Sequence, residues 1–152
     1  MIKSRDLAEF SKPVRVLDNK MDYATDDRGT EISNPFLMRE EGQYRMYFSA
    51  GQVYLEDCGF CEPKYISIAE SNSPEGPFSA RQVPIIAPDP DERWRNLCSG
   101  CLKVYRVQDG YIGIQNGIYK DEKGDSHSAI VLLTSDNGTD FRYVRNAGRA
   151  TG

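Results

Sequence analysis

Two stretches that repeat each other decide the fold of this chain. Residues 41–51 have the sequence EGQYRMYFSAG, and residues 108–117 have the sequence QDGYIGIQNG. When the stretches are superposed, Tyr44 falls on Tyr111, an offset of 111 − 44 = 67 residues. In each stretch a turn leads into a segment of alternating apolar residues, which predicts a strand with one side facing inward.

A second pair of segments follows at nearly the same spacing. Residues 68–78, IAESNSPEGPF, match residues 132–141, LLTSDNGTDF, with Ser71 over Ser135 at an offset of 135 − 71 = 64. A four-stranded unit that recurs at about 65 residues is typical of β-propeller blades. The alternative is a β-sandwich whose meanders look alike by chance. The sequence therefore predicts an all-β chain of propeller-type, four-stranded blades.

The expected elements divide the chain into a single, partial propeller domain. We expect strands at 35–38, 44–48, 65–70 and 82–86 in the first unit, and at 102–107, 111–115, 129–134 and 141–144 in the second. The divisions are 1–31 for an N-terminal strand and lead-in, 32–86 for blade one, 87–145 for blade two and 146–152 for a tail.

Three of these expectations rest on local detail. The apolar run Pro35–Met38 is typical of a strand buried on both faces, and Pro84 suggests an edge position for 82–86. Residues Pro13–Leu17 resemble the outer strand of an earlier blade. Leu7–Phe10 is the one short helix candidate, with Ser4 or Asp6 available as its cap.

Composition excludes several classes of function. The 152 residues contain no run near 18 apolar residues, which argues against a membrane span. The first ten residues lack the apolar core of a secretory signal, so we expect a cytoplasmic protein. A net charge of −4 without a basic cluster argues against a nucleic-acid partner.

The first unit resembles the blades of the five-bladed β-propeller glycosidases, which include glycoside hydrolase family 43 and the related families 32, 62, 68 and 130. The matching residues are Asn34-Pro35-Phe36-Leu37, the strand from Gly42 to Ser49, Ala69-Glu70-Ser71, and Ser73-Pro-Glu-Gly-Pro-Phe78, which is the most specific match. The segment from Thr134 to Phe141 resembles a Ser-Asp-Gly turn of the same superfamily. The resemblance covers about residues 32 to 145. It implies a carbohydrate-processing protein.

The chain departs from this family in length and in chemistry. Five blades need about twice this length, so the chain is expected to be a piece of a longer protein with further C-terminal blades or to close as a homo-oligomer. Hydrolysis needs two carboxyl groups. The family's strand-start aspartate falls on Asn34, and the second unit has Cys98-Ser-Gly-Cys101 at that place, so the catalytic set of the family does not carry over.

Other carboxylates lie in the loops that emerge on the ligand face of a blade, within 52–63 and 87–99. We expect candidate catalytic residues at Asp57, Glu62, Asp91 and Glu92, with Asp57 or Glu62 paired with Asp91 or Glu92. Candidate sugar-binding residues are Asn34, Arg93 and Trp94, because sugars pack on aromatic rings beside planar hydrogen-bonding groups. The alternative is a solvated acidic loop in which Trp94 packs at the blade junction. His127 is expected to be solvated in the loop 121–128.

Four cysteines form two Cys-x-x-Cys pairs, Cys58 with Cys61 and Cys98 with Cys101. Two such pairs can complete a tetrahedral zinc shell, and the blade pattern places both on one face, so a structural zinc clamp is one expectation. Buried thiols and disulfides are the alternatives. The main functional alternative to a glycosidase is then a non-catalytic carbohydrate-binding or assembly module held by this clamp.

Overall fold

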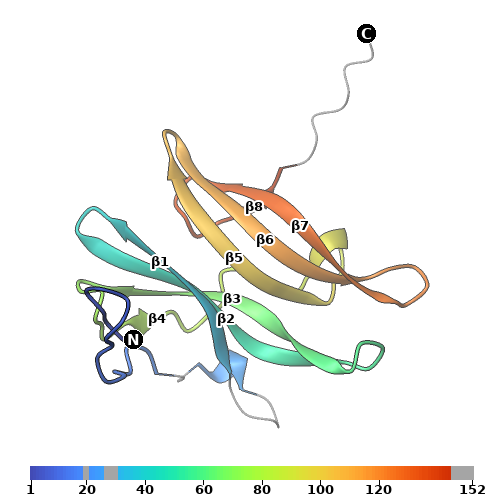
Figure 1. Cartoon of the computed structure of the whole chain (residues 1–152). Helices are drawn as coiled ribbons and strands as arrows, with labels where there is room; N and C mark the ends of the chain where they lie inside the picture. The colour runs from blue at the N-terminus through green and yellow to red at the C-terminus, as the bar shows by residue number, and fades with distance from the viewer. Residues whose placement is uncertain (19–20, 26–30, 145–152) are drawn as a thin grey trace.

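The computed structural model describes residues 1–18, 21–25 and 31–144, which form two four-stranded antiparallel sheets. The first sheet has the order β1 (Ile32–Glu40), β2 (Gln43–Leu55), β3 (Phe60–Ser71) and β4 (Ser79–Ala80). The second has the order β5 (Cys98–Val107), β6 (Gly110–Lys120), β7 (Ser126–Ser135) and β8 (Arg142–Tyr143). Two short 3-10 turns, η1 (Asp22–Ala24) and η2 (Arg93–Arg95), complete the elements. The two sheets stack face to face (Figure 1), which confirms the all-β, blade-type prediction.

The core between the sheets follows from strand alternation. Tyr47, Ile66 and Ile68 of the first sheet pack against Leu102 and Leu133 of the second, and all five are buried. Each burial of such a side chain is worth about 1.5–3 kcal/mol, so this layer holds the sheets together.

The opposite face of the first sheet is covered by the N-terminal segment. Met21 and Ala24 are buried against Phe48 and Ala69. The backbone N–H of Phe78 donates to the carbonyl of Val16 at 2.8 Å. The first sheet thus lies between the N-terminal segment and the second sheet (Figure 1).

Matching irregularities mark the two inner strands as repeats. Both β1 and β5 shift register near their starts, between Ser33 and Phe36 and between Cys98 and Cys101. Asn34 and Gly100 occupy the left-handed region there, with φ of 50° and 60°. The tight turn Glu41-Gly42 also has positive φ at both residues, as a two-residue hairpin requires, and this turn was predicted.

Several sequence predictions were wrong in detail. Residues 82–86 form no strand, and the fourth strand of the first sheet is Ser79–Ala80, while Ile86 makes only an isolated bridge to Ile66. Residues 35–38 are not buried on both faces, because Leu37 is 43% exposed.

The N-terminal predictions also failed. Residues 13–17 are not a strand. Ser4 and Asp6 accept backbone hydrogen bonds as caps do, but Leu7 has a φ of 62°, so no helix follows. The predicted tail, 146–152, lies outside the described residues. No helix in the described part of the chain is long and apolar enough to cross a membrane.

Candidate active site on the hairpin face

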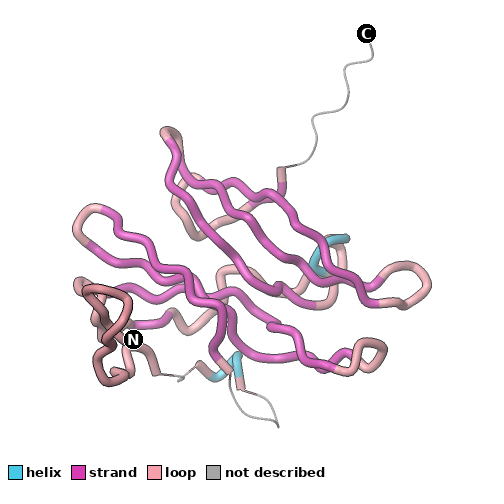
Figure 2. The backbone as a smooth tube through the Cα atoms, viewed as in Figure 1, coloured by secondary structure: helices cyan, strands magenta, loops and turns pink. Residues whose placement is uncertain are grey.

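Two long hairpins, β2–β3 and β6–β7, lie side by side at one end of the sheets (Figures 1 and 2). Asp57, in the turn of the first hairpin, joins them. Its carboxylate accepts hydrogen bonds from the backbone N–H of Ser126 at 2.6 Å and from the hydroxyl of Ser126 at 2.9 Å. These bonds favour the ionised form and lower the pKa of Asp57.

Glu62 lies on the same hairpin, and the pKa of its carboxyl group is shifted in the opposite direction. Partial burial raises the pKa of its carboxyl group above the ordinary value. The thiol pKa of Cys58, on the same hairpin, is raised first by burial and then by the charges of Asp57 and Glu62. The hairpin therefore holds two carboxyl groups whose pKa values are shifted in opposite directions, upward for Glu62 and downward for Asp57.

A row of rings runs alongside these carboxylates. The rings of Trp94 and Tyr119 meet edge to face with centroids 5.2 Å apart, and Tyr119 and His127 are 5.5 Å apart. The guanidinium of Arg93 lies over the indole at 4.5 Å. His127 also lines a small cavity of about 170 Å³ with Cys58 and Glu62, so the row reaches Glu62.

Two larger cavities on this face, each of about 610 Å³, share Lys120. One is lined by Asp57 and the hairpin around it, and the other by Asp91, Arg93 and Tyr119. The ammonium of Lys120 also lowers the pKa of Asp57. The cavities are therefore lined mainly by charged and polar side chains, with the rings of Tyr119 and Tyr54 among them.

Most of the predicted site residues lie on this face. Asp91 lines a cavity that Lys120 also lines, and Glu92 lines neither large cavity and acts electrostatically on Tyr143. The pairing of Asp57 or Glu62 with Asp91 or Glu92 stays a prediction. Asn34 is an exposed residue of β1 whose amide donates to the hydroxyls of Ser33 and Ser49 at 3.3 Å each.

The sequence analysis did not identify Tyr119 and Lys120 as site residues, and it placed His127 in a solvated loop rather than beside the rings. His127 is 45% exposed at its side chain, but it packs on Tyr119 and contacts the carboxylate of Asp121 at 3.1 Å. The predicted strand ended at residue 115, whereas β6 runs to Lys120. The sequence signal for that extension was the aromatic residue Tyr119, which lies beyond the predicted end of the strand.

The predicted zinc clamp has no support in the structure. Side chains alternate along β3, so Cys61 points to the face opposite Glu62, whose carboxylate is near Cys98. Cys98 is fully buried beside Leu55, and burial, with a further contribution from Glu62, raises its pKa to about 12. Within the described residues, no group of three or more His, Cys, Asp or Glu side chains could hold a metal ion.

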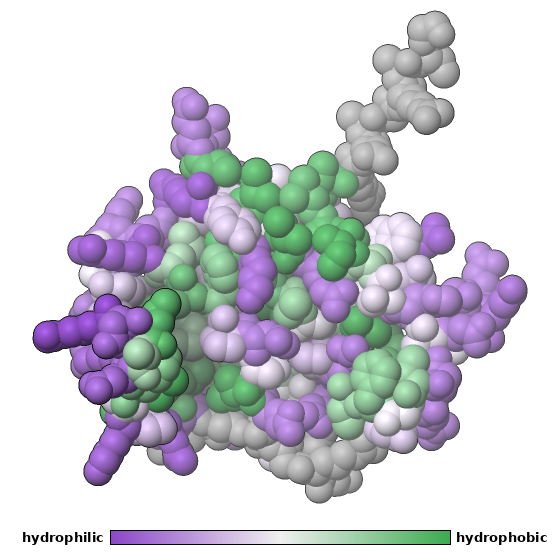
Figure 3. Space-filling view, viewed as in Figure 1, coloured by the Kyte–Doolittle hydropathy of each residue, from purple (hydrophilic) through white to green (hydrophobic). Residues whose placement is uncertain are grey.

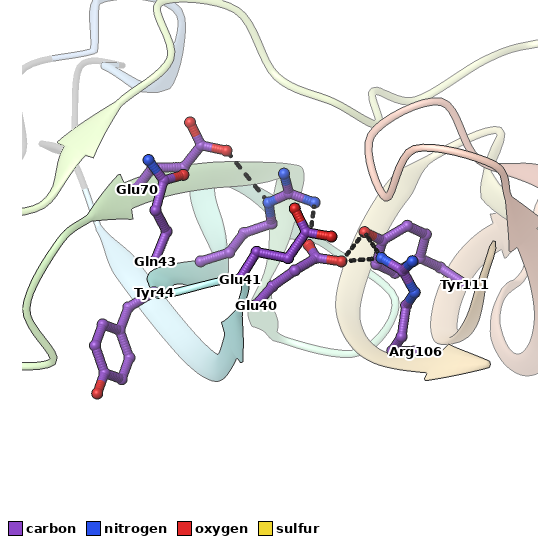
Figure 4. Close-up of a pocket in the computed structure, with 8 residues that line it drawn as sticks. Glu40, Glu41, Gln43, Tyr44, Glu70, Arg106 and Tyr111 are labelled. Atoms are coloured by element: carbon purple, nitrogen blue, oxygen red, sulfur yellow. Dashed lines mark hydrogen bonds and ion pairs between the residues drawn. The ribbon is translucent and has the colours of Figure 1, made fainter. Parts of the chain in front are cut away.

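A separate cavity of about 270 Å³ lies at the other end of the sheets (Figure 4). There Glu40 accepts hydrogen bonds from Arg106 and Tyr111 and pairs with Arg45 at 3.3 Å. Arg45 also pairs with Glu70 at 3.2 Å. Glu40 joins the first sheet to Arg106 and Tyr111 of the second, and Arg45 pairs within the first sheet, so the cavity is better explained as an inter-sheet contact than as a binding site.

Comparison with known proteins places the fold. No family model matches the sequence, and no curated protein matches it. Solved structures do match. One of them, a glycoside hydrolase, aligns over 96% of this chain and 47% of its own, with 15% identity and a TM-score of 0.70.

Two further structures belong to the same class of enzyme. A glycosyl hydrolase from Bacteroides ovatus covers 76% of this chain and 31% of its own at 15% identity and a TM-score of 0.60. A thermostable family-43 glycoside hydrolase covers 76% and 33% at 14% identity and a TM-score of 0.55. The chain spans less than half the length of each of these proteins. It has the fold of about two blades of the five-bladed propeller glycoside hydrolases.

Proposed function

We propose that this chain is the sugar-binding and hydrolytic part of a carbohydrate-processing protein, with its site on the hairpin face. The observation that carries the proposal is the meeting of Asp57, Glu62 and the ring row at one end of a glycosidase-type fold. The structural neighbours that are named as glycoside hydrolases support the class of substrate. A glycan screen identifies the sugar and the linkage.

In this proposal the two carboxyl groups have different roles. Glu62, whose carboxyl pKa is raised by burial, acts as the general acid toward the departing glycosidic oxygen, and Asp57, whose pKa is lowered by its bonds to Ser126, acts as base or nucleophile. Tyr119 offers its ring to the C–H groups of the sugar, with Trp94 packed edge to face against it, and Arg93 and Lys120, which line the same cavity, donate to the sugar hydroxyls.

The test is a glycan screen on the purified chain, followed by product release from every glycan that binds. Glu62→Gln and Asp57→Asn should each lower the cleavage rate at least about 100-fold, the usual weight of a general acid or base. Asp109→Asn, in the exposed turn at the opposite end, is the matched control and should leave the rate unchanged. Equal rates in all variants would refute the assignment.

A second candidate is a non-catalytic carbohydrate-binding module. It is favoured by Asn34, an amide at the position where the resemblance expects a carboxylate. This candidate predicts binding without release of product. It also predicts that Trp94→Ala weakens binding while Glu62→Gln does not.

A further inference from the structure

Trp94 of the ring row lies on η2, a turn of three residues with no buried side chain. So short a turn is not stable by itself, and the core does not fix it. Its position must therefore be set by polar contacts with the rest of the protein. One set of contacts lies toward β6 (Figure 2), where the side chain of Asn96 pairs with the backbone of Lys120 at 2.8 and 3.1 Å.

Arg95 provides a second set of contacts, on the side of the core between the sheets. Its guanidinium donates to the carbonyl of Ala87 and pairs with the carboxylate of Asp89 at 3.4 Å. The same guanidinium lies 5.6 Å from the centre of the Tyr143 ring, within the range of a cation–π contact. Because the side chain of Arg95 is only 20% exposed, these contacts are largely shielded from water and stronger than on an open surface.

The Tyr143 ring is itself fixed by a chain of hydrogen bonds. Its hydroxyl donates to the side-chain carbonyl of Gln115 at 3.0 Å, and the amide of Gln115 donates to the backbone carbonyl of Ser99 at 2.8 Å. Gln115 is fully buried, and Tyr143 packs against the apolar core between the sheets. A buried amide that is paired at both ends has one orientation. Arg95 therefore connects η2 to a rigid part of the second sheet.

We infer that Arg95 is a positioning residue, which keeps Trp94 in the ring row by tying η2 to Tyr143 and to Ala87. A planar guanidinium suits this role, because it donates in two directions while it stacks on a ring, and an ammonium group does not. The inference rests on the proposed function only for what the ring row binds. Loss of Arg95 leaves Asp57 and Glu62 on their own hairpin and releases Trp94.

The fluorescence of Trp94 tests the inference, because Trp94 is the only tryptophan of the chain. In Arg95→Ala the emission should shift to longer wavelength, and the acrylamide quenching constant should rise about twofold or more as η2 opens locally. Arg95→Lys should change both in the same direction, because it keeps the charge but not the planar contacts. The spectra are recorded without denaturant, on variants whose circular dichroism matches that of the unmodified chain.

Arg142→Ala is the matched control. Arg142 also pairs with a carboxylate, that of Asp136 at 3.1 Å, but its side chain is 76% exposed on β8, so its loss should leave the Trp94 emission unchanged. A merely structural Arg95 would lower the stability and leave the emission of the folded protein unchanged, which would overturn the inference. An Arg95→Lys variant with the unmodified spectrum would also overturn it, and this variant keeps the test open if Arg95→Ala does not fold.

Kinetics on any glycan that is cleaved give an independent readout. Arg95→Ala should raise KM about tenfold and leave kcat nearly unchanged, because it disturbs a binding ring and not the carboxyl groups. A fall in kcat with an unchanged KM would contradict the positioning role. A spectral shift in a protein that binds no glycan would refute the proposed function alone and support the role of Arg95, so the two failures are distinguishable. Apolar and polar atoms alternate over the surface of the second sheet (Figure 3), and this test uses neither.

Discussion

At the scale of single residues, the bulge in β5 depends on one glycine. Gly100 has a φ of 60°, and a β-carbon added to it would lie 1.7 Å from the carbonyl oxygen of Asn116 on the neighbouring strand. The carbonyl of Gly100 also accepts a hydrogen bond of 2.7 Å from Ser49 across the sheets. Neither the close approach nor this bond can persist if a side chain occupies the site.

We therefore expect Gly100→Ala to lower the free energy of unfolding by roughly 3 kcal/mol or more. Gly59→Ala is the control, because Gly59 also has positive φ, 74°, but has no atom within 4 Å of its added β-carbon. It should cost only about 1 kcal/mol for the backbone conformation. Urea unfolding measures both. Equal losses would show that the close approach in β5 does not exist.

At the scale of elements, Tyr47 links the two sheets through its hydroxyl. The hydroxyl donates to the carbonyl of Gly138 at 2.9 Å, and the residue is fully buried. Burial raises the pKa of Tyr47 to about 12. Because the folded pKa exceeds the unfolded value near 10, this group contributes stability that is present below pH 10 and is lost as the pH rises toward 12.

Tyr47→Phe should thus cost about 1 kcal/mol at neutral pH, the usual weight of such a hydrogen bond. It should also make the loss of stability between about pH 10 and 12 less steep than in the unmodified chain. Thermal unfolding across that range measures the difference. If the two proteins lose stability in parallel above about pH 10, Tyr47 does not hold its proton as described.

The strands show how far sequence patterns reach. The alternation of apolar residues and the turn residues predicted the locations of seven of the eight strands. They also predicted the turn at Glu41-Gly42. Strand lengths were missed in the first hairpin, where β2 continues past Gly51 to Leu55 and β3 begins at Phe60. Val53 and Leu55 carry the alternation there and pack against Cys98 and Ile118, so the sequence held a signal that Gly51 interrupted.

The fourth strand of the first sheet was misplaced for another reason. Residues 82–86 have strand-forming residues, but Ser79–Ala80 pairs with Ala69 and Glu70 because the turn before it places it there. Local propensity could not reveal a pairing that depends on turn geometry.

At the scale of the whole molecule, the site depends on which loops meet. Asp57 and Glu62 could be named from the sequence because the blade pattern places their loop on the ligand face. The ring row could not be predicted from the sequence, because Trp94, Tyr119 and His127 come together only through the length of β6 and the placement of η2. The four-cysteine clamp stays a prediction without support here, because strand alternation places Cys61 and Glu62 on opposite faces of β3.

The molecule therefore has two ends with different chemistry. At one end the charges are paired across the sheets around Glu40, and at the other the hairpins hold shifted carboxyl groups, rings and open cavities. The central claim is that sugars bind only at the hairpin end.

Amide chemical shifts, recorded by NMR during titration with each glycan that binds in the screen, test this claim most directly. We predict that the shifts change at the two hairpin turns and around η2, and that Trp94→Ala abolishes them. Changes confined to the other end, around Glu40 and Arg106, would contradict the account, as would saturable binding that moves neither hairpin.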